Sequence, residues 1–134
     1  MTLNIDYRQN VSLETADIIR VLESSGIRRP SDDPDRIERM FANASLVITA
    51  WRGERLVGLA RSITDFSYCC YLSDLAVERE FQRLGIGREL IVRTQAAIGD
   101  EVSLMLLAAP EAMSYYPALG FEVIDNGFKI ARKR

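Results

Sequence analysis

The order of apolar and polar positions predicts a strand and two helices in the first third of the chain. Residues 3–9 alternate between apolar and polar side chains, which indicates an edge strand. A helix is expected between a cap at Ser12 and a stop at Gly26, and a second helix begins behind Asp33 with Pro34 in its first turn. The side chains that these helices are expected to bury are Leu13, Ala16, Ile19, Leu22, Ile37, Met40 and Phe41.

Most of the β structure is expected in the middle of the chain. Two β-rich runs, 45–51 and 55–64, flank a short turn that contains glycine, and together they predict a hairpin. A further strand at 68–77 precedes a helix over 84–98. The run 103–109 is apolar throughout, as in a buried and parallel strand.

The C-terminal part is expected to complete a sheet that is covered by helices. A short helix over 111–119 should end at Gly120, and residues 121–133 should form one bent strand or a hairpin that turns at Asn126-Gly127. The resulting order, β-α-α-β-β-β-α-β-α-β, predicts a mixed sheet with helices on its faces. A length of 134 residues fits a single domain over 1–134.

Composition and charge narrow the classes of partner. The chain carries 17 basic and 19 acidic residues, a net charge of −2, which argues against general electrostatic binding to nucleic acid. The first ten residues are mostly polar, and no run approaches the ~20 apolar residues that span a bilayer. We therefore expect a cytoplasmic protein with no membrane or nucleic-acid partner.

The cysteine and histidine content limits the available chemistry. Cys69 and Cys70 are adjacent, and neighbouring strand residues point to opposite faces, so we expect two reduced thiols. The chain has no histidine, which removes histidine-based triads and zinc sites, and we expect no metal. Proton transfer must then use a carboxylate, a tyrosine, a thiol or water.

A glycine-containing segment between a predicted strand and a predicted helix is a candidate phosphate site. The first N–H groups of a helix lack internal acceptors, and glycine lets an anion approach them closely. The alternative is a turn that only packs the helix near the sheet. The absence of G-x-G-x-x-G argues against a Rossmann loop, and the missing Gly-Lys-Ser/Thr excludes a Walker loop. The candidate residues are Gln82, Arg83, Leu84, Gly85, Ile86, Gly87 and Arg88.

Two signatures in this order resemble those of the GNAT family of N-acetyltransferases. Residues 82–87, Q-R-L-G-I-G, match the pattern Q/R-x-x-G-x-G/A, and residues 115–121, Y-Y-P-A-L-G-F, are similar to aromatic-Tyr-x-x-x-Gly-Phe. The resemblance implies a GNAT-like acyl-CoA N-acyltransferase fold of the α+β class, with three layers (α/β/α). In that fold the central sheet is mixed and mostly antiparallel, and its fourth and fifth strands run parallel and splay apart.

The resemblance also implies a binding mode for acetyl-CoA as cosubstrate. The pantetheine arm would lie in the gap between the splayed strands, where backbone groups of Leu75, Ala76 and Val77 would bond its amides and the thioester carbonyl. Residues 82–88 would hold the pyrophosphate. The alternative is that Leu75 and Val77 are core residues that take no part in binding the cosubstrate.

For the chemistry, the resemblance gives Tyr116 the role of general acid, since a phenol is protonated at neutral pH. The alternative is that Tyr116 only packs within its short helix. Its neighbour Tyr115 is expected to lie in the core. Many family members carry a glutamate where this chain has Ser73. Asp74, the nearest carboxylate, is therefore a candidate general base, which could act through an ordered water molecule. The alternative is that Asp74 has a structural role and only bonds backbone amides.

The acceptor would be selected by the connector between the first two helices and by the loop before the fourth strand. Arg28 is a candidate for holding a carboxylate of the acceptor, and Phe66 and Tyr68 for enclosing its amine. Arg29 and Arg61 offer the same chemistry, but arginines at such places are more often solvated or paired with aspartate.

Together these assignments predict an N-acetyltransferase that moves the acetyl group of acetyl-CoA to a primary amine of a small molecule by direct attack. Two alternatives stay open, a protein or peptide N-acetyltransferase and a non-catalytic regulator that only binds acyl-CoA. Homodimers are common in the family, so a homodimer is compatible with the resemblance.

Overall fold

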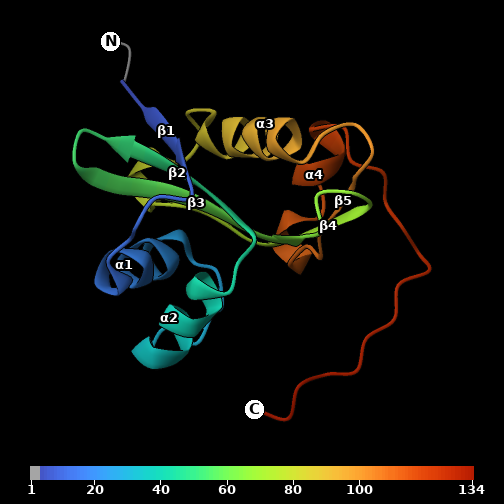
Figure 1. Ribbon diagram of the computed structural model, residues 1–134, viewed down its shortest axis with the longest axis horizontal. Coiled ribbons are helices and arrows are strands. Elements are labelled where there is room, and N and C mark those ends of the chain that lie inside the picture. The colour runs from blue at the N-terminus through green and yellow to red at the C-terminus, as the bar shows by residue number, and fades with distance from the viewer. Residues whose placement is uncertain (1–3) are drawn as a thin grey trace.

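A five-stranded sheet forms the centre of the computed structural model, which describes residues 4–134. Its strands follow the order β1-β2-β3-β4-β5, antiparallel throughout except for β5, which is parallel to β4. This confirms the expected mixed, mostly antiparallel sheet (Figure 1). The strands are β1 Asp6–Gln9, β2 Leu46–Arg52, β3 Arg55–Thr64, β4 Cys69–Val77 and β5 Ser103–Met105.

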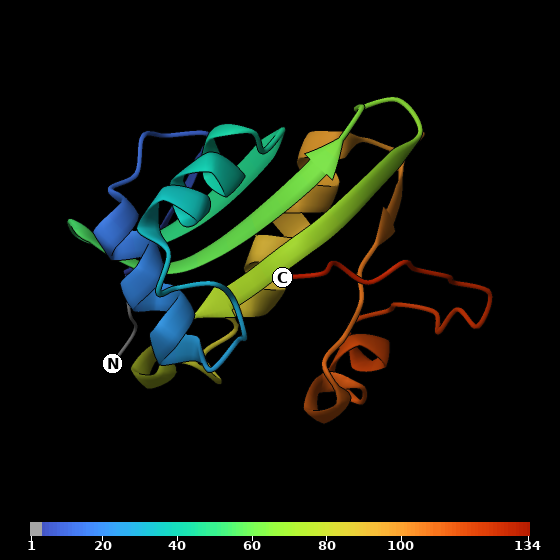
Figure 2. The ribbon, with the colours of Figure 1, turned by 90° about the horizontal axis from the view of Figure 1, so that it is seen from below.

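Helices cover both faces of this sheet and give the three layers that the sequence predicts. Helices α1 and α2 lie on one face and α3 lies on the other (Figures 1 and 2). Because both faces are covered, every residue of 46–51 in β2 is buried. The helices are α1 Thr15–Ser25, α2 Pro34–Ala42, α3 Ile86–Ile98 and α4 Tyr115–Ala118, with 3₁₀ turns at Arg79–Phe81 and Pro110–Ala112.

The helix ends mostly follow the capping residues expected from the sequence. Asp33 accepts a hydrogen bond from the backbone N–H of Arg36 at 3.1 Å and so caps α2. Gly26 adopts the left-handed conformation directly after α1, as a helix stop should. The cap predicted at Ser12 is wrong, because α1 begins later, behind Glu14, whose side chain makes no capping hydrogen bond.

Two apolar clusters hold the layers together. On the α1 and α2 face, Leu22 and Ile37 are fully buried, as expected. Ala16 is exposed and Ile18 is buried instead, so the inward face of α1 is rotated from the predicted one. On the opposite face, Leu90 of α3 packs into the cluster that joins α3 to β2 and β3.

The C-terminal part departs most from expectation. β5 has only three residues, of which Ser103 and Met105 are exposed and Leu104 is half-buried, whereas the sequence predicts a buried strand over 103–109. The helix predicted over 111–119 is reduced to the 3₁₀ turn at Pro110–Ala112 and the four residues of α4. Residues 121–133 form no strand, because β-prone residues form one only where a neighbouring strand pairs with them.

β4 and β5 separate soon after they meet, which confirms the predicted splay. Their ladder runs from the pair Cys69–Ser103 to the pair Tyr71–Met105 and then stops. Beyond Tyr71, β4 continues to Val77, and among residues 4–134 only β3 pairs with it there. The second half of β4 therefore has one open edge.

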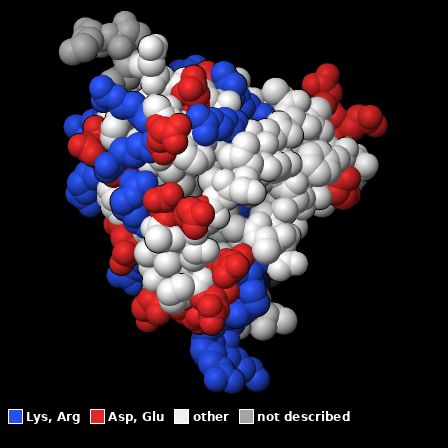
Figure 3. Space-filling model, turned by 60° about the vertical axis from the view of Figure 1, so that its left-hand side comes forward, with Lys and Arg blue, Asp and Glu red and all other residues white. Residues whose placement is uncertain are grey.

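The surface carries charges of both signs. On the face shown in Figure 3, basic and acidic side chains are intermixed beside a broad uncharged area. Cys69 is exposed, Cys70 is buried, and both are free, as expected. None of the helices within residues 4–134 has the length and apolarity needed to cross a bilayer.

Candidate active site

The open edge of β4 offers backbone hydrogen-bonding groups to a ligand. The N–H of Glu78 donates to the carbonyl of Val57 at 2.8 Å, which identifies a hydrogen-bonded pair of the β3–β4 ladder. Because backbone groups alternate in direction along a strand, Ala76 also directs its N–H and C=O to β3. Leu75 and Val77 direct theirs to the open side, so the register gives free groups to these two residues and not to Ala76.

Gln82 braces the end of this strand. Its side-chain amide donates to the carbonyl of Val77 at 2.9 Å and to the carbonyl of Ser25, at the end of α1, at 3.5 Å. The outward carbonyl of Val77 is thereby occupied. The groups that remain for a ligand are the N–H and C=O of Leu75 and the N–H of Val77.

The chain enters α3 through a segment whose N–H groups lack protein acceptors. Arg83 and Gly85 have positive φ values of 64° and 85°, and such left-handed residues turn successive N–H groups toward one side. The first helical bond runs from the N–H of Glu89 to the carbonyl of Gly85 at 3.0 Å. Within the described chain, the N–H groups of the first three residues of α3 therefore have no acceptor. The helix begins at Ile86 rather than at the predicted Leu84.

This turn is suited to bind an anion of phosphate size. Its free N–H groups lie at the N-terminus of α3, where the helix dipole adds partial positive charge. The side chains of Arg83 and Arg88 are exposed beside it and can add charge-assisted hydrogen bonds. Leu84 is also exposed, so only its backbone is suited to such a ligand.

A tyrosine hydroxyl lies over the first turn of α3. A Cβ added to Gly87 would lie 2.7 Å from the Oη of Tyr115, which is closer than carbon and oxygen pack. Burial raises the pKa of the Tyr115 phenol, and the charge of Arg88 acts in the opposite direction. The hydroxyl is thus protonated at neutral pH and available as a donor beside the phosphate site. The sequence predicts only a core position for Tyr115, because no feature of the chain shows which way its ring points.

Tyr116 lies next to Tyr115 on α4. Its ring makes edge-to-face contacts with Tyr115, at 5.1 Å between centroids, and with Phe121, at 5.5 Å. Burial is the main cause that raises the pKa of the Tyr116 phenol; Tyr115 adds to the rise and the charge of Arg29 opposes it. The phenol therefore keeps its proton through the neutral range, as a proton donor must.

Asp74, the candidate base, is held between two arginines. Its carboxylate is fully buried, and its two oxygens accept hydrogen bonds from the Nε groups of Arg29 and Arg61. Both arginines also bind Ser73, through its carbonyl at 2.6 Å and its hydroxyl at 3.0 Å. Ser73 is a bulge, since Asp74 pairs with Arg61 while Leu72 pairs with the next residue of β3. Asp74 is thus a counter-ion that fixes both guanidinium groups at the bulge.

Replacing Asp74 with asparagine is expected to destabilise the fold by ~2–3 kcal/mol, because two guanidinium groups lose their counter-charge. Urea unfolding measures the change, with Glu80→Gln as the matched control. Glu80 is exposed and contacts Arg55 at 3.4 Å, so its replacement should change stability little. An Asp74→Asn variant with parental stability and no turnover would instead identify a base.

The residues predicted to bind the acceptor are only partly brought together. Arg28 is exposed, and its carbonyl accepts a hydrogen bond from Arg29, so it borders the arginine pair. Phe66 and Tyr68 lie in the β3–β4 loop, at the far end of β4 (Figure 2). At ~3.3 Å per residue, Tyr68 is roughly 20 Å along the strand from Leu75. The structure therefore does not bring Phe66 and Tyr68 to the open end of β4.

Arg29, like Tyr115, is a functional candidate that the sequence indicates only weakly. The sequence does not distinguish it from Arg28 and Arg61, and its partner is Asp74 rather than an aspartate of its own connector. The pairing joins residues far apart in the chain, so no local pattern could have shown it. No group of three or more potential metal-binding side chains occurs among residues 4–134.

Comparisons with known proteins find relatives that match most of this chain. An uncharacterized N-acetyltransferase ycf52 from Gracilaria tenuistipitata var. liui is 28% identical over 131 residues, which cover 95% of this chain and 72% of that protein. A probable acetyltransferase from meticillin-resistant Staphylococcus aureus shares the fold with a TM-score of 0.81 at 20% identity, over 96% of this chain and 100% of the other. The aminoglycoside N-acetyltransferase AAC(6′)-Iy, solved in complex with CoA, shares the fold with a TM-score of 0.73 at 17% identity. The match covers 100% of this chain and 98% of that protein. Residues 22–131 match the acetyltransferase (GNAT) domain model, and the chain therefore belongs to the GNAT acetyltransferase family.

Proposed function

We propose that this acetyltransferase moves the acetyl group of acetyl-CoA to a primary amine of a small molecule, by direct attack of the amine on the thioester. One observation supports this most strongly. The open edge of β4 leads, within a few residues, to the acceptor-free N–H groups at the start of α3. In CoA the pantetheine arm, with its amides, is joined to the pyrophosphate. The backbone groups of β4 can bond the pantetheine amides, and the N–H groups at the start of α3 can bind the pyrophosphate, so the two sites follow one another in the same order.

In this proposal the protein backbone holds most of the cosubstrate. Leu75 and Val77 bond the pantetheine amides through the groups that the register leaves free. The N–H groups of 83–88 bind the pyrophosphate, with Arg83 and Arg88 at the rim. Tyr115 adds its hydroxyl near Gly87, where the phosphates approach the helix most closely.

Tyr116 is proposed as the general acid. The amine nitrogen attacks the thioester carbon, the C–S bond breaks, and the leaving thiolate takes the phenol proton of Tyr116. The phenolate regains a proton from solvent. The new amide nitrogen loses its extra proton to water, because Asp74 is enclosed by guanidinium groups and is not available as a base.

The arginine pair favours a reactive amine. Arg29 and Arg61 carry two positive charges against the single negative charge of Asp74, which leaves one in excess. A positive charge nearby disfavours an ammonium ion, so it lowers the pKa of an amine bound there and increases the neutral fraction that can attack. Arg28, exposed beside the pair, is placed to contact an anionic part of the acceptor.

A small-molecule acceptor is supported by the CoA-bound structural neighbour, whose name identifies an aminoglycoside acetyltransferase. Protein or peptide acetylation and non-catalytic acyl-CoA binding are the competing outcomes. A cytoplasmic location stays a prediction, since relatives of this chain include plastid proteins, such as a chloroplastic one from Arabidopsis thaliana that is 30% identical over 78 residues.

The test combines binding with turnover. Acetyl-CoA should raise the melting temperature, because it binds the folded state only. Loss of the thioester absorbance should then accelerate with a matching amine from a panel of polyamines, amino acids, aminoglycosides and lysine peptides. This readout avoids thiol reagents, which would also react with the exposed Cys69. Turnover with peptides alone would contradict the small-molecule proposal, and binding without turnover would favour a regulator.

A further inference from the structure

Arg29 is the accessible member of the arginine cluster, which Arg29, Arg61 and Asp74 form at the bulge of β4. Asp74 is fully buried and the side chain of Arg61 is 10% exposed, whereas that of Arg29 is 26% exposed. The ring of Phe41 covers Arg61, at 5.5 Å from its guanidinium carbon. A ligand that approaches the cluster therefore meets Arg29 first.

The guanidinium of Arg29 keeps hydrogen-bond donors for such a ligand. Its Nε donates to Asp74, one Nη donates to the carbonyl of Arg28, and the other donates to the carbonyl of Ser73 at 2.6 Å. Each Nη carries two hydrogens, so one N–H on each has no acceptor within residues 4–134. The cluster also has one positive charge in excess. A carboxylate matches both features, because it offers two oxygens and a single negative charge.

Arg29 lies beside the place where the amine must react. It binds the carbonyl of Ser73, two residues before Leu75, and at ~3.3 Å per residue these positions are roughly 7 Å apart along β4. Burial raises the pKa of the Tyr116 phenol, Tyr115 adds to the rise, and the charge of Arg29 opposes it, so Arg29 is within electrostatic reach of the proposed general acid. A carboxylate bound to Arg29 thus lies within the length of a small acceptor from the thioester.

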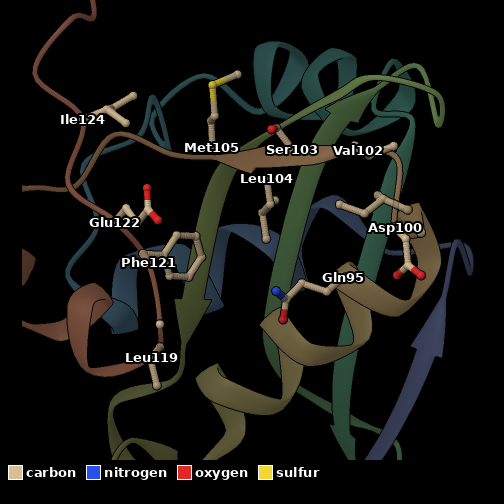
Figure 4. A pocket seen from close by; sticks show the side chains of 13 residues that line it. Gln95, Asp100, Val102, Ser103, Leu104, Met105, Leu119, Phe121, Glu122 and Ile124 are labelled. Atoms are coloured by element: carbon tan, nitrogen blue, oxygen red, sulfur yellow. The ribbon is translucent and has the colours of Figure 1, made fainter.

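Three exposed apolar side chains, which we call the apolar row, cross the sheet nearby. Ile63 pairs with Tyr71, Tyr71 pairs with Met105, and the three are 44%, 39% and 42% exposed. Directly opposed residues share a face, and Leu72, next to Tyr71, packs on the α3 side. Figure 4 shows Met105 pointing away from α3 and Leu104 pointing toward it. The row therefore lies on the α1 and α2 side of the sheet, where both helices leave it exposed.

The apolar row and the arginine cluster border the same gap from the same side. The cluster faces α2, because Arg61 donates to the carbonyl of Met40 in that helix at 3.4 Å. Tyr71–Met105 is the last pair before β4 and β5 separate, so the row forms the base of the gap. Ser73, which holds the cluster, is two residues further along β4. A ligand placed there meets positive charge at one end and apolar surface at the other.

We propose that the acceptor is an amino acid with an apolar side chain. Its carboxylate binds the two unused N–H groups of Arg29, its side chain packs on the apolar row, and its amine faces the thioester in the gap between β4 and β5. Pairing with the guanidinium neutralises the carboxylate, which weakens its hold on the proton of the neighbouring amine. The products are the N-acetyl amino acid and CoA. This inference rests on the acetyl transfer proposed above, and it excludes protein N-termini, whose amine lies beside an amide instead of a carboxylate.

Matched acceptors separate this proposal from acetyl transfer in general. L-phenylalaninamide keeps the amine and the ring of L-phenylalanine and replaces the carboxylate with a neutral amide, while glycine lacks the side chain. We expect kcat/KM for L-phenylalanine to exceed that for the amide by ~10²-fold or more, because the amide loses two charge-assisted hydrogen bonds. It should exceed that for glycine by ~10-fold or more, because glycine buries no apolar surface on the row. Equal or faster turnover of the amide would overturn the proposal and leave acetyl transfer intact.

Arg29→Gln tests the anchor itself. It should lower kcat/KM for L-phenylalanine by ~10²-fold or more and that for L-phenylalaninamide by far less, since only the carboxylate loses its partner. Arg29→Lys keeps the charge beside Asp74 but lacks the planar fork, so it retains the fold if glutamine does not and should also reduce the preference for the carboxylate. Arg93→Gln, on the exposed side of α3, is the matched control and should change neither value. An equal loss with both acceptors would identify a structural role and overturn the proposal.

Binding to the CoA complex gives a readout that needs no turnover. With CoA in place of acetyl-CoA, isothermal titration calorimetry should show L-phenylalanine binding the parent with ~10²-fold or more higher affinity than it binds Arg29→Gln. Binding that depends on Arg29, without consumption of acetyl-CoA, would contradict acetyl transfer and support the carboxylate site. If L-phenylalanine, L-leucine and glycine neither bind nor react, the proposal is wrong, whatever other amines do.

Discussion

Replacing Tyr116 with phenylalanine is expected to lower kcat by ~10²–10⁴-fold, the usual size of a general-acid contribution. The substitution removes one hydroxyl and keeps the ring, so the edge-to-face contacts with Tyr115 and Phe121 persist. Affinity for acetyl-CoA should change little, because backbone groups make most of the proposed contacts. A loss in kcat rather than in binding is the mark of an interaction made mainly in the transition state.

The pH profile provides a second readout of the same role. Burial raises the pKa of Tyr116 above its ordinary value of 10.0. The acid form is therefore fully present at neutral pH, and activity should decline only in the strongly alkaline range, where the phenol ionises. Tyr116→Phe should lack this decline, since it has no proton to lose there.

Tyr115→Phe is the matched control for both measurements. It makes the same chemical change one residue away, at a hydroxyl that lies over α3. Its effect should appear in acetyl-CoA affinity and not in kcat. If Tyr116→Phe keeps parental kcat with an acceptor for which chemistry limits the rate, Tyr116 is a packing residue and water donates the proton.

The second large effect is expected at the phosphate site. Gly87→Val should weaken acetyl-CoA binding by ~10²–10⁴-fold, since it removes about two charge-assisted hydrogen bonds of ~1.5–3 kcal/mol each. The branched side chain would stand between the pyrophosphate and the first N–H groups of α3. Isothermal titration calorimetry measures the change directly.

The clash of a Cβ at position 87 with the Tyr115 hydroxyl requires a paired design, because that contact alone could disturb α4. Tyr115→Phe removes the oxygen, and the nearest ring carbon is then 3.9 Å away. Gly87→Val is therefore compared with its parent in the Tyr115→Phe background, with thermal unfolding as the check on folding. Equal affinity of the two proteins would show that the phosphates bind elsewhere.

The features that the sequence predicted correctly have local causes. Asp33 caps α2 through a bond to a residue three positions later, and Gly26 ends α1 through its own backbone conformation. The hairpin of β2 and β3 follows from two β-rich runs around one turn. The first family signature also lies within one short segment, so the turn that leads into α3 could be located from the sequence, although the helix begins two residues later than predicted.

The features that were missed depend on contacts between distant segments. Asp74 meets Arg29 and Arg61, which come from a connector and from β3, so a reading along β4 could not distinguish a base from a counter-ion. The strand predicted over 121–133 has suitable residues but pairs with no other strand among residues 4–134. Phe66 and Tyr68 precede β4 and Leu75 lies near its other end, and their separation depends on how far the strand runs without interruption, which no local pattern gives.

The central claim is that acetyl-CoA binds the open edge of β4 and the first turn of α3, and not the cavity between β5 and the stretch 119–124. Amide chemical shifts of labelled protein, recorded while acetyl-CoA is added, test this residue by residue. We expect the largest changes at Leu75, Val77 and the amides of 85–88, while Val102, Ser103 and Leu104, which line the cavity beside β5, shift little. Changes concentrated at these three residues, with the amides of 85–88 unmoved, would contradict the claim.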